Sequence, residues 1–224
     1  MLNSIDTNNA AVISGQITSN FRPCPGNNTG NLFLVDLAVK RLSGRTDYIP
    51  LSVSIETAGA MQGQIGRDIQ ASGKFVSCNY HDREGSHLQL SLLVQSYAFL
   101  QHEEKNQNSI FLDGYLSRTP IFRMTPLGRK ITDLTVAVNY PYTESDYIPC
   151  ICWGKNALEA SLFPCGTHIH ALGRIQSREY SKKINEYQTC TKTAYEISIK
   201  KIELPDSPLS LPSQLKRKTL RLSV

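Results

Sequence analysis

Apolar and polar residues alternate along much of the chain, as they do in strands that cover a core on one side. Side chains of a strand point alternately to its two faces. In the stretch GTHIHALGRIQSREY (166–180), the apolar residues at positions 169, 171 and 175 form one face, which we expect to be buried. The opposite face, which we expect in solvent, ends in Arg174, Gln176, Arg178 and Tyr180. Two arginines followed by an aromatic ring make this strand a candidate binding surface.

Short runs of this β type recur along the chain, separated by Gly, Pro, Asn or charged turns. In the second half they cover residues 110–117, 130–140, 146–153, 167–180 and 194–204. The helical pattern is short in both halves, and covers 57–66 in the first and 154–163 in the second. Five strands with one short helix after the third predict an OB-fold, a partly open Greek-key barrel.

The first half of the chain repeats the second at an offset of 99 residues, which becomes 100 in the last block. TDYIPLSVSIETA (46–58) matches SDYIPCICWGKNA (145–157), and GRDIQASGKFVSCNY (66–80) matches 166–180. Self-similarity of this kind indicates a duplication. We therefore predict an all-β fold with short helices, built from two tandem five-stranded OB-fold barrels that arose by internal duplication.

Composition sets the expected boundaries of these units. The first OB-fold is expected at 1–100, a polar linker at 101–108 and the second OB-fold at 109–204. Residues 205–224 are rich in Pro and Ser and then basic, so we expect a flexible tail there.

The net charge of +5 is unevenly distributed. Residues 1–107 carry 8 Lys and Arg against 9 Asp and Glu, residues 108–204 carry 12 against 9, and residues 205–224 carry 4 against 1. An anionic partner is therefore expected at the second half and the tail. No run of 18 apolar residues predicts a membrane span, and the first ten residues lack the regions of a signal peptide. We expect a cytoplasmic protein without membrane contact.

The six cysteines are expected to be small buried hydrophobic residues rather than disulfides, because the cytosol is reducing. Cys150 and Cys152 should share the buried side of one strand. The stretch CGTHIH offers Cys165, His168 and His170 as candidate zinc ligands, and Cys150 with Cys152 is the only nearby source of further ligands. A structural zinc site needs four ligands, and strand histidines beside a buried cysteine are the commoner case. We expect no metal and no cofactor.

Several motifs occur together in the second repeat: GYLSRTP, RMTPLG, a strand that ends in AVN, WGKNA and GRIQSREY. With this combination the chain resembles the bacterial single-stranded DNA-binding protein family in its tandem OB-fold version, over roughly residues 9–204. The resemblance implies a cytoplasmic, nucleoid-associated protein that binds and protects single-stranded DNA, independently of sequence, in replication, recombination or repair. It also implies an assembly of four OB domains, and therefore a homodimer of this chain.

The end of the chain departs from that family. Its members usually finish in an acidic tip with a terminal phenylalanine, which recruits other replication proteins. Here the last residues are LKRKTLRLSV, which are basic and contain no aromatic residue. Recruitment through an acidic C-terminal tip is therefore not expected.

Binding of single strands without sequence preference requires cations for the phosphates and aromatic faces for the bases. The resemblance assigns base stacking to Tyr142, Tyr147, Trp153 and Tyr180. The candidate phosphate contacts are Arg123, Arg129, Lys130, Lys155, Arg174 and Arg178. The first repeat keeps as minor contributors Tyr48, Lys74 and Tyr80. Since rings and charges are fewer there, our hypothesis is that the first barrel serves mainly assembly and the second does most of the binding.

Other interpretations remain open. A tyrosine near a strand end is often a packing residue, and Trp153 in a core is the alternative to a surface site. No Ser-His-Asp order, paired acids or glycine fingerprint indicates an enzyme, so we expect none. The second function considered is an OB-fold assembly or interaction protein of the replication machinery, a primosomal-type factor or paralogue with weak or no DNA binding. RNA is a physically possible ligand of the same kind of groove.

Overall fold

The computed structural model describes residues 8–27, 30–83, 85–101, 107–141, 144–183 and 189–205, and these residues form twelve strands and two short helices. The first repeat contains β1 (Asn9–Ile17), β2 (Arg22–Pro23), β3 (Leu32–Lys40), β4 (Thr46–Ser54), α1 (Ile55–Ala60), β5 (Asp68–Asp82) and β6 (Gly85–Phe99). The second contains β7 (Asn108–Leu116), β8 (Ile121–Met124), β9 (Lys130–Val138), β10 (Asp146–Trp153), α2 (Gly154–Ala160), β11 (His168–Lys183) and β12 (Thr189–Glu203). Neither described helix has the length or apolar character needed to cross a membrane.

Each repeat forms a five-stranded barrel of the OB type. In the first, hydrogen-bonded neighbours run β3-β4-β6-β5-β1, and β1 also pairs with β3, which closes the barrel. The β4–β6 pairing is parallel, whereas the β3–β4 and β5–β6 pairings are antiparallel. The second repeat has the order β9-β10-β12-β11-β7 and closes by pairing β7 with β9. The predicted tandem OB-fold is confirmed.

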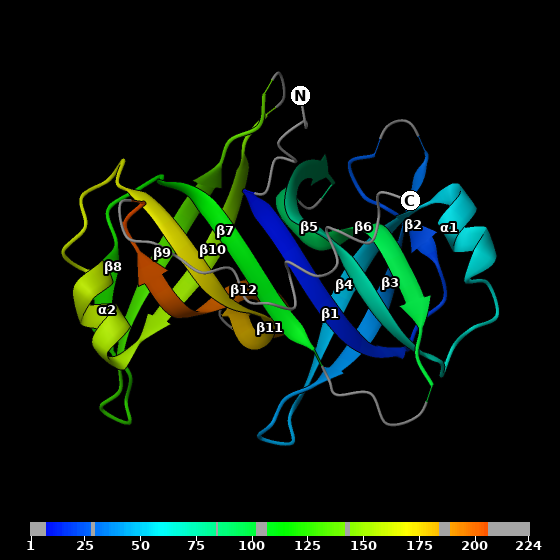
Figure 1. Ribbon diagram of the computed structural model, residues 1–224, viewed down its shortest axis with the longest axis horizontal. Helices are drawn as coiled ribbons and strands as arrows, with labels where there is room; N and C mark the ends of the chain where they lie inside the picture. The colour runs from blue at the N-terminus through cyan, green and yellow to red at the C-terminus, as the bar shows by residue number, and fades with distance from the viewer. Residues whose placement is uncertain are drawn as a thin grey trace.

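The two barrels are joined by β1 and β7, which makes one twelve-stranded sheet. The pairing is antiparallel and centred on Ala11 and Ile110, which occupy equivalent positions in the two repeats. Figure 1 shows the barrels side by side, with α1 and α2 at opposite ends of the molecule. One hydrophobic cluster includes buried residues of both repeats. The barrels therefore pack as a single unit.

Gly15 and Gly114 occupy equivalent positions where each barrel closes. A Cβ atom at Gly15 would lie 2.2 Å from the carbonyl oxygen of Ala38, and one at Gly114 would lie 2.4 Å from that of Ala137. Any larger side chain would therefore push β1 away from β3, or β7 away from β9. Both repeats need glycine here because the backbones of neighbouring strands approach so closely.

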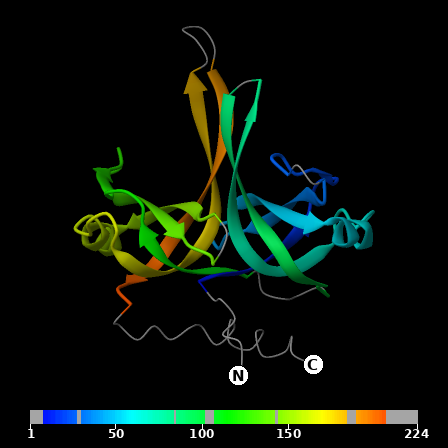
Figure 2. The same ribbon diagram turned by 90° about the horizontal axis from the view of Figure 1, so that it is seen from above.

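The long hairpins β5–β6 and β11–β12 project on the same side of the molecule, as Figure 2 shows. Each hairpin also contacts the other repeat, since β11 packs against β4 and β5 packs against β10. Residues of β4 and β11 both line the groove between the barrels in which the candidate site lies.

The apolar face predicted for 166–180 is confirmed, because Ile169, Ala171 and Ile175 are fully buried. Cys150 and Cys152 are also buried on one side of β10. The expectation that every cysteine is buried is wrong: Cys24, Cys78 and Cys190 are half-buried, and Cys165 is exposed because it lies in the turn before β11.

Two details of the predicted elements are also corrected. The helix expected at 57–66 is shorter and begins earlier, at Ile55, because Ser54 caps it and the chain then turns through Gly63 and Gly66, which have φ values of 75° and 89°. The short strands β2 and β8 were not predicted. The linker residues 102–106 and the tail from 206 onward lie outside the described residues, so the domain boundaries and the expectations for the tail remain predictions.

Candidate nucleic-acid interface

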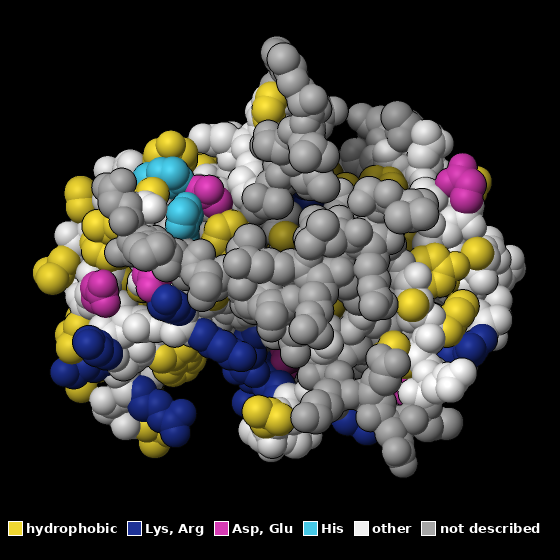
Figure 3. All heavy atoms as spheres, in the orientation of Figure 1, with side chains coloured by type: hydrophobic (Ala, Val, Ile, Leu, Met, Phe, Trp, Pro, Cys, Tyr) yellow, Lys and Arg dark blue, Asp and Glu magenta, His cyan; other side chains and the backbone are white. Residues whose placement is uncertain are grey.

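A groove of about 940 Å³ lies between the two barrels. Its walls come from β8 to β12 of the second barrel, and from β4 of the first barrel with the loop that precedes it. The basic side chains that line it are Arg41, Arg45, Arg123, Arg129, Arg174 and Arg178. Two exposed aromatic rings, Tyr48 and Trp153, line it as well. In Figure 3, Lys and Arg side chains border both sides of the hollow at the lower left.

Trp153 ends β10 and is 38 % exposed, so the alternative of a core residue is excluded. It occupies the N-cap position of α2 but makes no side-chain capping bond. Its counterpart Ser54 caps α1, because its Oγ accepts a hydrogen bond of 3.2 Å from the Thr57 amide. The second repeat has therefore exchanged a helix cap for an exposed indole beside several arginines.

The groove brings together only part of the predicted set. Its lining includes Trp153, Arg123, Arg129, Arg174 and Arg178, together with Tyr48 from the minor set. The predicted residues outside its lining are Tyr147, Tyr180, Lys130, Lys155, Lys74 and Tyr80. Tyr142 lies outside the described residues. The sequence interpretation missed Arg41 and Arg45, which come from the first repeat.

Tyr48 and Tyr147 occupy equivalent positions on β4 and β10, and each lies against the opposite barrel. Tyr48 is 56 % exposed and lines the groove formed mainly by the second barrel. Tyr147 is 50 % exposed, and its amide donates a hydrogen bond of 3.0 Å to the hydroxyl of Ser77 on β5. The duplication therefore places one tyrosine on each side of the boundary between the barrels.

Three groove arginines are paired with acids: Arg123 and Arg41 by two hydrogen bonds each, and Arg178 more loosely, with its Nε atom 3.9 Å from Oε2 of Glu196. Arg123 donates two hydrogen bonds to Asp133, of 2.6 and 3.2 Å. Arg41 makes the same two-pronged contact with Asp47 and also donates to the carbonyl of Ser177, at 3.0 Å. Burial alone would raise the pKa of Asp47, but the Arg41 guanidinium and the amide and hydroxyl of Ser177 outweigh it and lower that pKa. These pairs hold the guanidinium groups in fixed orientations.

Arg174 belongs to a small polar network on the floor of the groove. Its guanidinium donates to the Gln176 side chain at 3.1 Å, and Gln176 in turn donates to Glu196 at 2.7 Å. Burial, and then the nearby charge of Arg41, lower the pKa of Arg174. The expectation that Gln176 lies in solvent is wrong: it is buried, and its amide group tolerates burial because both of its polar atoms are hydrogen-bonded to these neighbours. Within the described residues, no acidic oxygen lies within ion-pair distance of Arg45, Arg129 or Arg174.

Other predicted residues lie farther along the two hairpins. Arg178 lies with its Cζ atom 5.9 Å from the ring centroid of Tyr180, which is 39 % exposed. This pair extends the basic and aromatic surface from the groove onto β11. On the other hairpin, Tyr80 stacks on His87 with ring centroids 5.1 Å apart, so one face of its ring is already covered.

Comparison with known proteins shows which family the chain belongs to. Residues 107–205 match the Single-strand binding protein family. Single-stranded DNA-binding protein B of Bacillus subtilis is 34 % identical over 92 residues, which are 37 % of this chain and 80 % of that protein. The chain belongs to the single-strand binding protein family.

A second relative covers less of its own length. The single-stranded DNA-binding protein of Halalkalibacterium halodurans is 38 % identical over 80 residues, which are 33 % of this chain and 48 % of that protein. The chain therefore spans about half the length of that relative. The crystal structure of wild-type single-stranded DNA binding protein from Thermus aquaticus aligns with 92 % of this chain and 97 % of its own, at a TM-score of 0.64 and 20 % identity. The crystal structure of a deletion mutant of the same Thermus protein aligns at a TM-score of 0.67 and 18 % identity. The alignment covers 91 % of this chain and 96 % of the mutant chain. At these identities the structural likeness concerns the fold, and it extends over both barrels.

Proposed function

We propose that the chain binds single-stranded DNA without sequence preference in the groove between its barrels. The observation that carries the proposal is the convergence of six arginines with Trp153 and Tyr48 in one open groove. Guanidinium groups neutralise phosphates, and each stacked base contributes about 1–3 kcal/mol in sites of this kind. The names of the curated relatives support DNA as the ligand.

We infer that the bound DNA continues from the groove onto the hairpin β11–β12. Arg178 lines the groove and also faces Tyr180, so the two residues join the groove to the hairpin surface. The three arginines without an acidic partner in the described structure, Arg45, Arg129 and Arg174, are the strongest candidates for phosphate contacts. We also propose that the chain protects DNA in replication, recombination or repair, in the cytoplasm and at the nucleoid, by a binding mode that involves no catalysis.

The test is the fluorescence of Trp153, which is the single tryptophan of the chain, during titration with oligo-dT. A base stacked on the indole quenches the emission, and added salt reverses the quenching because phosphate contacts release counterions. Arg123→Ala should weaken binding, whereas the control Arg22→Ala should not. Arg22 makes a similar two-pronged pair with Asp36 in the first barrel, outside the groove. Unchanged emission, together with no binding in an anisotropy assay, would refute the proposal.

We further propose that two chains assemble into a homodimer with four OB barrels. The resemblance of both repeats to a family that works with four such domains supports this arrangement. Light scattering on the intact protein should give about twice the chain mass of 25.0 kDa. A monomer mass over a wide concentration range would contradict it. No observation favours the alternative of an interaction protein that lacks DNA binding.

A further inference from the structure

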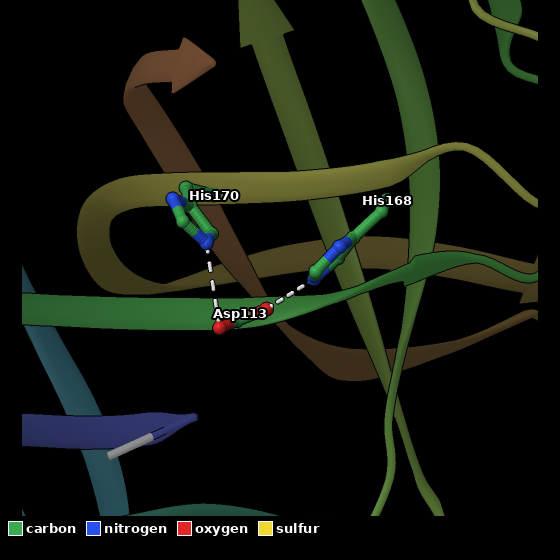
Figure 4. Close-up of side chains that lie close together, drawn as sticks. All are labelled: Asp113, His168 and His170. Atoms are coloured by element: carbon green, nitrogen blue, oxygen red, sulfur yellow. Dashed lines mark hydrogen bonds and ion pairs between the residues drawn. The ribbon is translucent and has the colours of Figure 1, made fainter. Parts of the chain in front are cut away.

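Two histidines and one aspartate converge on the face of the second barrel that carries β7 and β11. His168 and His170 are two residues apart on β11 and share one face of that strand. Asp113 on β7 is directly paired with His170 in the register of the two strands. Figure 4 shows both imidazoles pointing from β11 toward the carboxylate of Asp113. None of the three residues lines the groove between the barrels.

The donor atoms are close enough to share one ion. Nε2 of His168 lies 2.5 Å from Oδ1 of Asp113, and Nε2 of His170 lies 3.3 Å from Oδ2. One donor atom from each of the three residues lies within 4.8 Å of the others. Zinc bonds to imidazole nitrogen and carboxylate oxygen are about 2.0–2.2 Å long, which separates the ligands of a tetrahedral ion by about 3.4 Å. Shifts on the order of 1 Å would seat an ion between these side chains.

Glu203 lies beside His170 and can supply the second partner that metal-binding histidines use. The Nδ1 atom of His170 is buried and has no hydrogen-bond partner in the described structure, and the same holds for Oε2 of Glu203, whose other carboxylate oxygen pairs with Lys201. His170 and Glu203 are directly opposite each other in the β11–β12 pairing, so their side chains share a face. A carboxylate that accepts the free ring N–H of a ligand histidine fixes its tautomer and orientation.

Aromatic rings hold both imidazoles in place. Tyr115 stacks on His168 with ring centroids 4.4 Å apart and an interplanar angle of 14°. Phe111 flanks His170 at 5.6 Å. All three candidate ligands are half-buried, so they are partly shielded from water yet accessible to an ion.

We propose that Asp113, His168 and His170 form a binding site for a divalent transition-metal ion, with Zn²⁺ as the ion that this donor set fits best. Two imidazoles and one carboxylate leave a fourth position for water. Nε2 of each histidine binds the ion, and Glu203 orients His170. The bound ion links β7 to β11, next to the seam that joins the barrels. None of the thiols of Cys150, Cys152 and Cys165 takes part, because none belongs to the group of donor atoms that lie within 4.8 Å of one another.

The test is a titration of the intact, tag-free protein with Co²⁺, in which the visible absorption of the bound Co²⁺ is measured. Zn²⁺ is then added to displace the bound Co²⁺. The expected result is one saturable ion per chain for the wild type. Asp113→Asn and His170→Gln should each weaken binding at least tenfold, and Glu203→Gln should weaken it about tenfold, as expected for an orienting partner. His87→Gln is the matched control, because His87 pairs with Asp82 at 2.9 Å without a second histidine. Cys165→Ser is the control for a thiol ligand.

The outcomes separate clearly. Wild-type binding that both controls keep, and that Asp113→Asn and His170→Gln lose, supports the site. Absence of saturable binding to the wild type overturns it, and this result does not depend on any variant. Binding lost only in Cys165→Ser, or kept by Asp113→Asn, overturns it as well. Circular dichroism and oligo-dT binding of each variant show that the fold is intact.

Discussion

Asp47 on β4 accepts two hydrogen bonds from Ser177 on β11, across the boundary between the barrels. The amide donates at 2.7 Å and the hydroxyl at 3.0 Å. The equivalent residues of the other repeat make the same contact in the opposite direction, since Asp146 accepts from the amide of Ser77 at 2.5 Å and from its hydroxyl at 3.0 Å. The barrels are therefore held together by two copies of one contact, in addition to the β1–β7 pairing.

Asp47→Asn should destabilise the whole protein. The substitution removes the counter-charge of Arg41, whose side chain is only 16 % exposed, and weakens both bonds from Ser177. We expect a loss of about 1–3 kcal/mol in the free energy of unfolding, measured by urea denaturation. The control is Asp36→Asn, whose partner Arg22 is 46 % exposed, and which should cost at most about 1 kcal/mol. Equal costs in the two variants would contradict this role for Asp47.

Because the pKa of Asp47 is lowered in the folded protein, the stability contributed by Asp47 should depend on pH. The pKa of Asp47 is lowered in the folded protein, whereas in the unfolded chain it is about 3.9. Its contribution to stability is therefore complete above the unfolded value and is lost as the pH falls through the folded one. The difference in unfolding free energy between wild type and Asp47→Asn should shrink as the pH falls below about 4 and through the lowered pKa of Asp47. A difference that stays constant over this range would show that ionisation of Asp47 is not responsible.

Arg45→Ala tests whether the first barrel contributes to DNA binding. If Arg45 contacts a phosphate, its removal should make the slope of log K against log salt shallower by about 0.7. Arg129→Ala, on the opposite side of the groove, should give a similar change. An effect of Arg129→Ala without one of Arg45→Ala would support the hypothesis that the second barrel does most of the binding.

Tyr180→Ala and Tyr80→Ala form a matched pair from the two hairpins. Tyr180 offers an exposed ring beside Arg178, whereas one face of the Tyr80 ring is covered by His87. We expect Tyr180→Ala to reduce the oligo-dT affinity by about 1–3 kcal/mol and Tyr80→Ala to reduce it by less. Equal losses, measured by anisotropy, would argue that both hairpins bind the strand equally.

The thiols should differ strongly in reactivity. Burial raises the pKa of Cys152 to about 12 and that of Cys150 well above its usual range. A thiol with such a pKa carries almost no thiolate at neutral pH, so neither residue should react in the folded protein. The exposed Cys165 should react first with a disulfide reagent. Cys165→Ser should remove the fastest phase, and a persistent fast phase would contradict the assignment.

Local alternation and the internal repeat were sufficient to predict both barrels, because each strand buries one face and each repeat closes on itself. They did not predict β8, which has four residues and therefore too little alternation to detect. Trp153 and four groove arginines were found because the family motifs lie within single strands and turns. Arg41 and Arg45 were missed because their place depends on how one repeat packs on the other. Asp113 precedes His168 by 55 residues, so only the β7–β11 register brings the two together.

Pairing of β1 with β7 inside one chain has a consequence for the composition of any assembly. Two separate barrels would part on dilution, but a tether holds their local concentration constant at every protein concentration. The two barrels also always meet in equal numbers, one of each kind. A difference such as Trp153 before α2 and Ser54 before α1 can therefore persist in one barrel only. The groove can keep walls of different composition for the same reason.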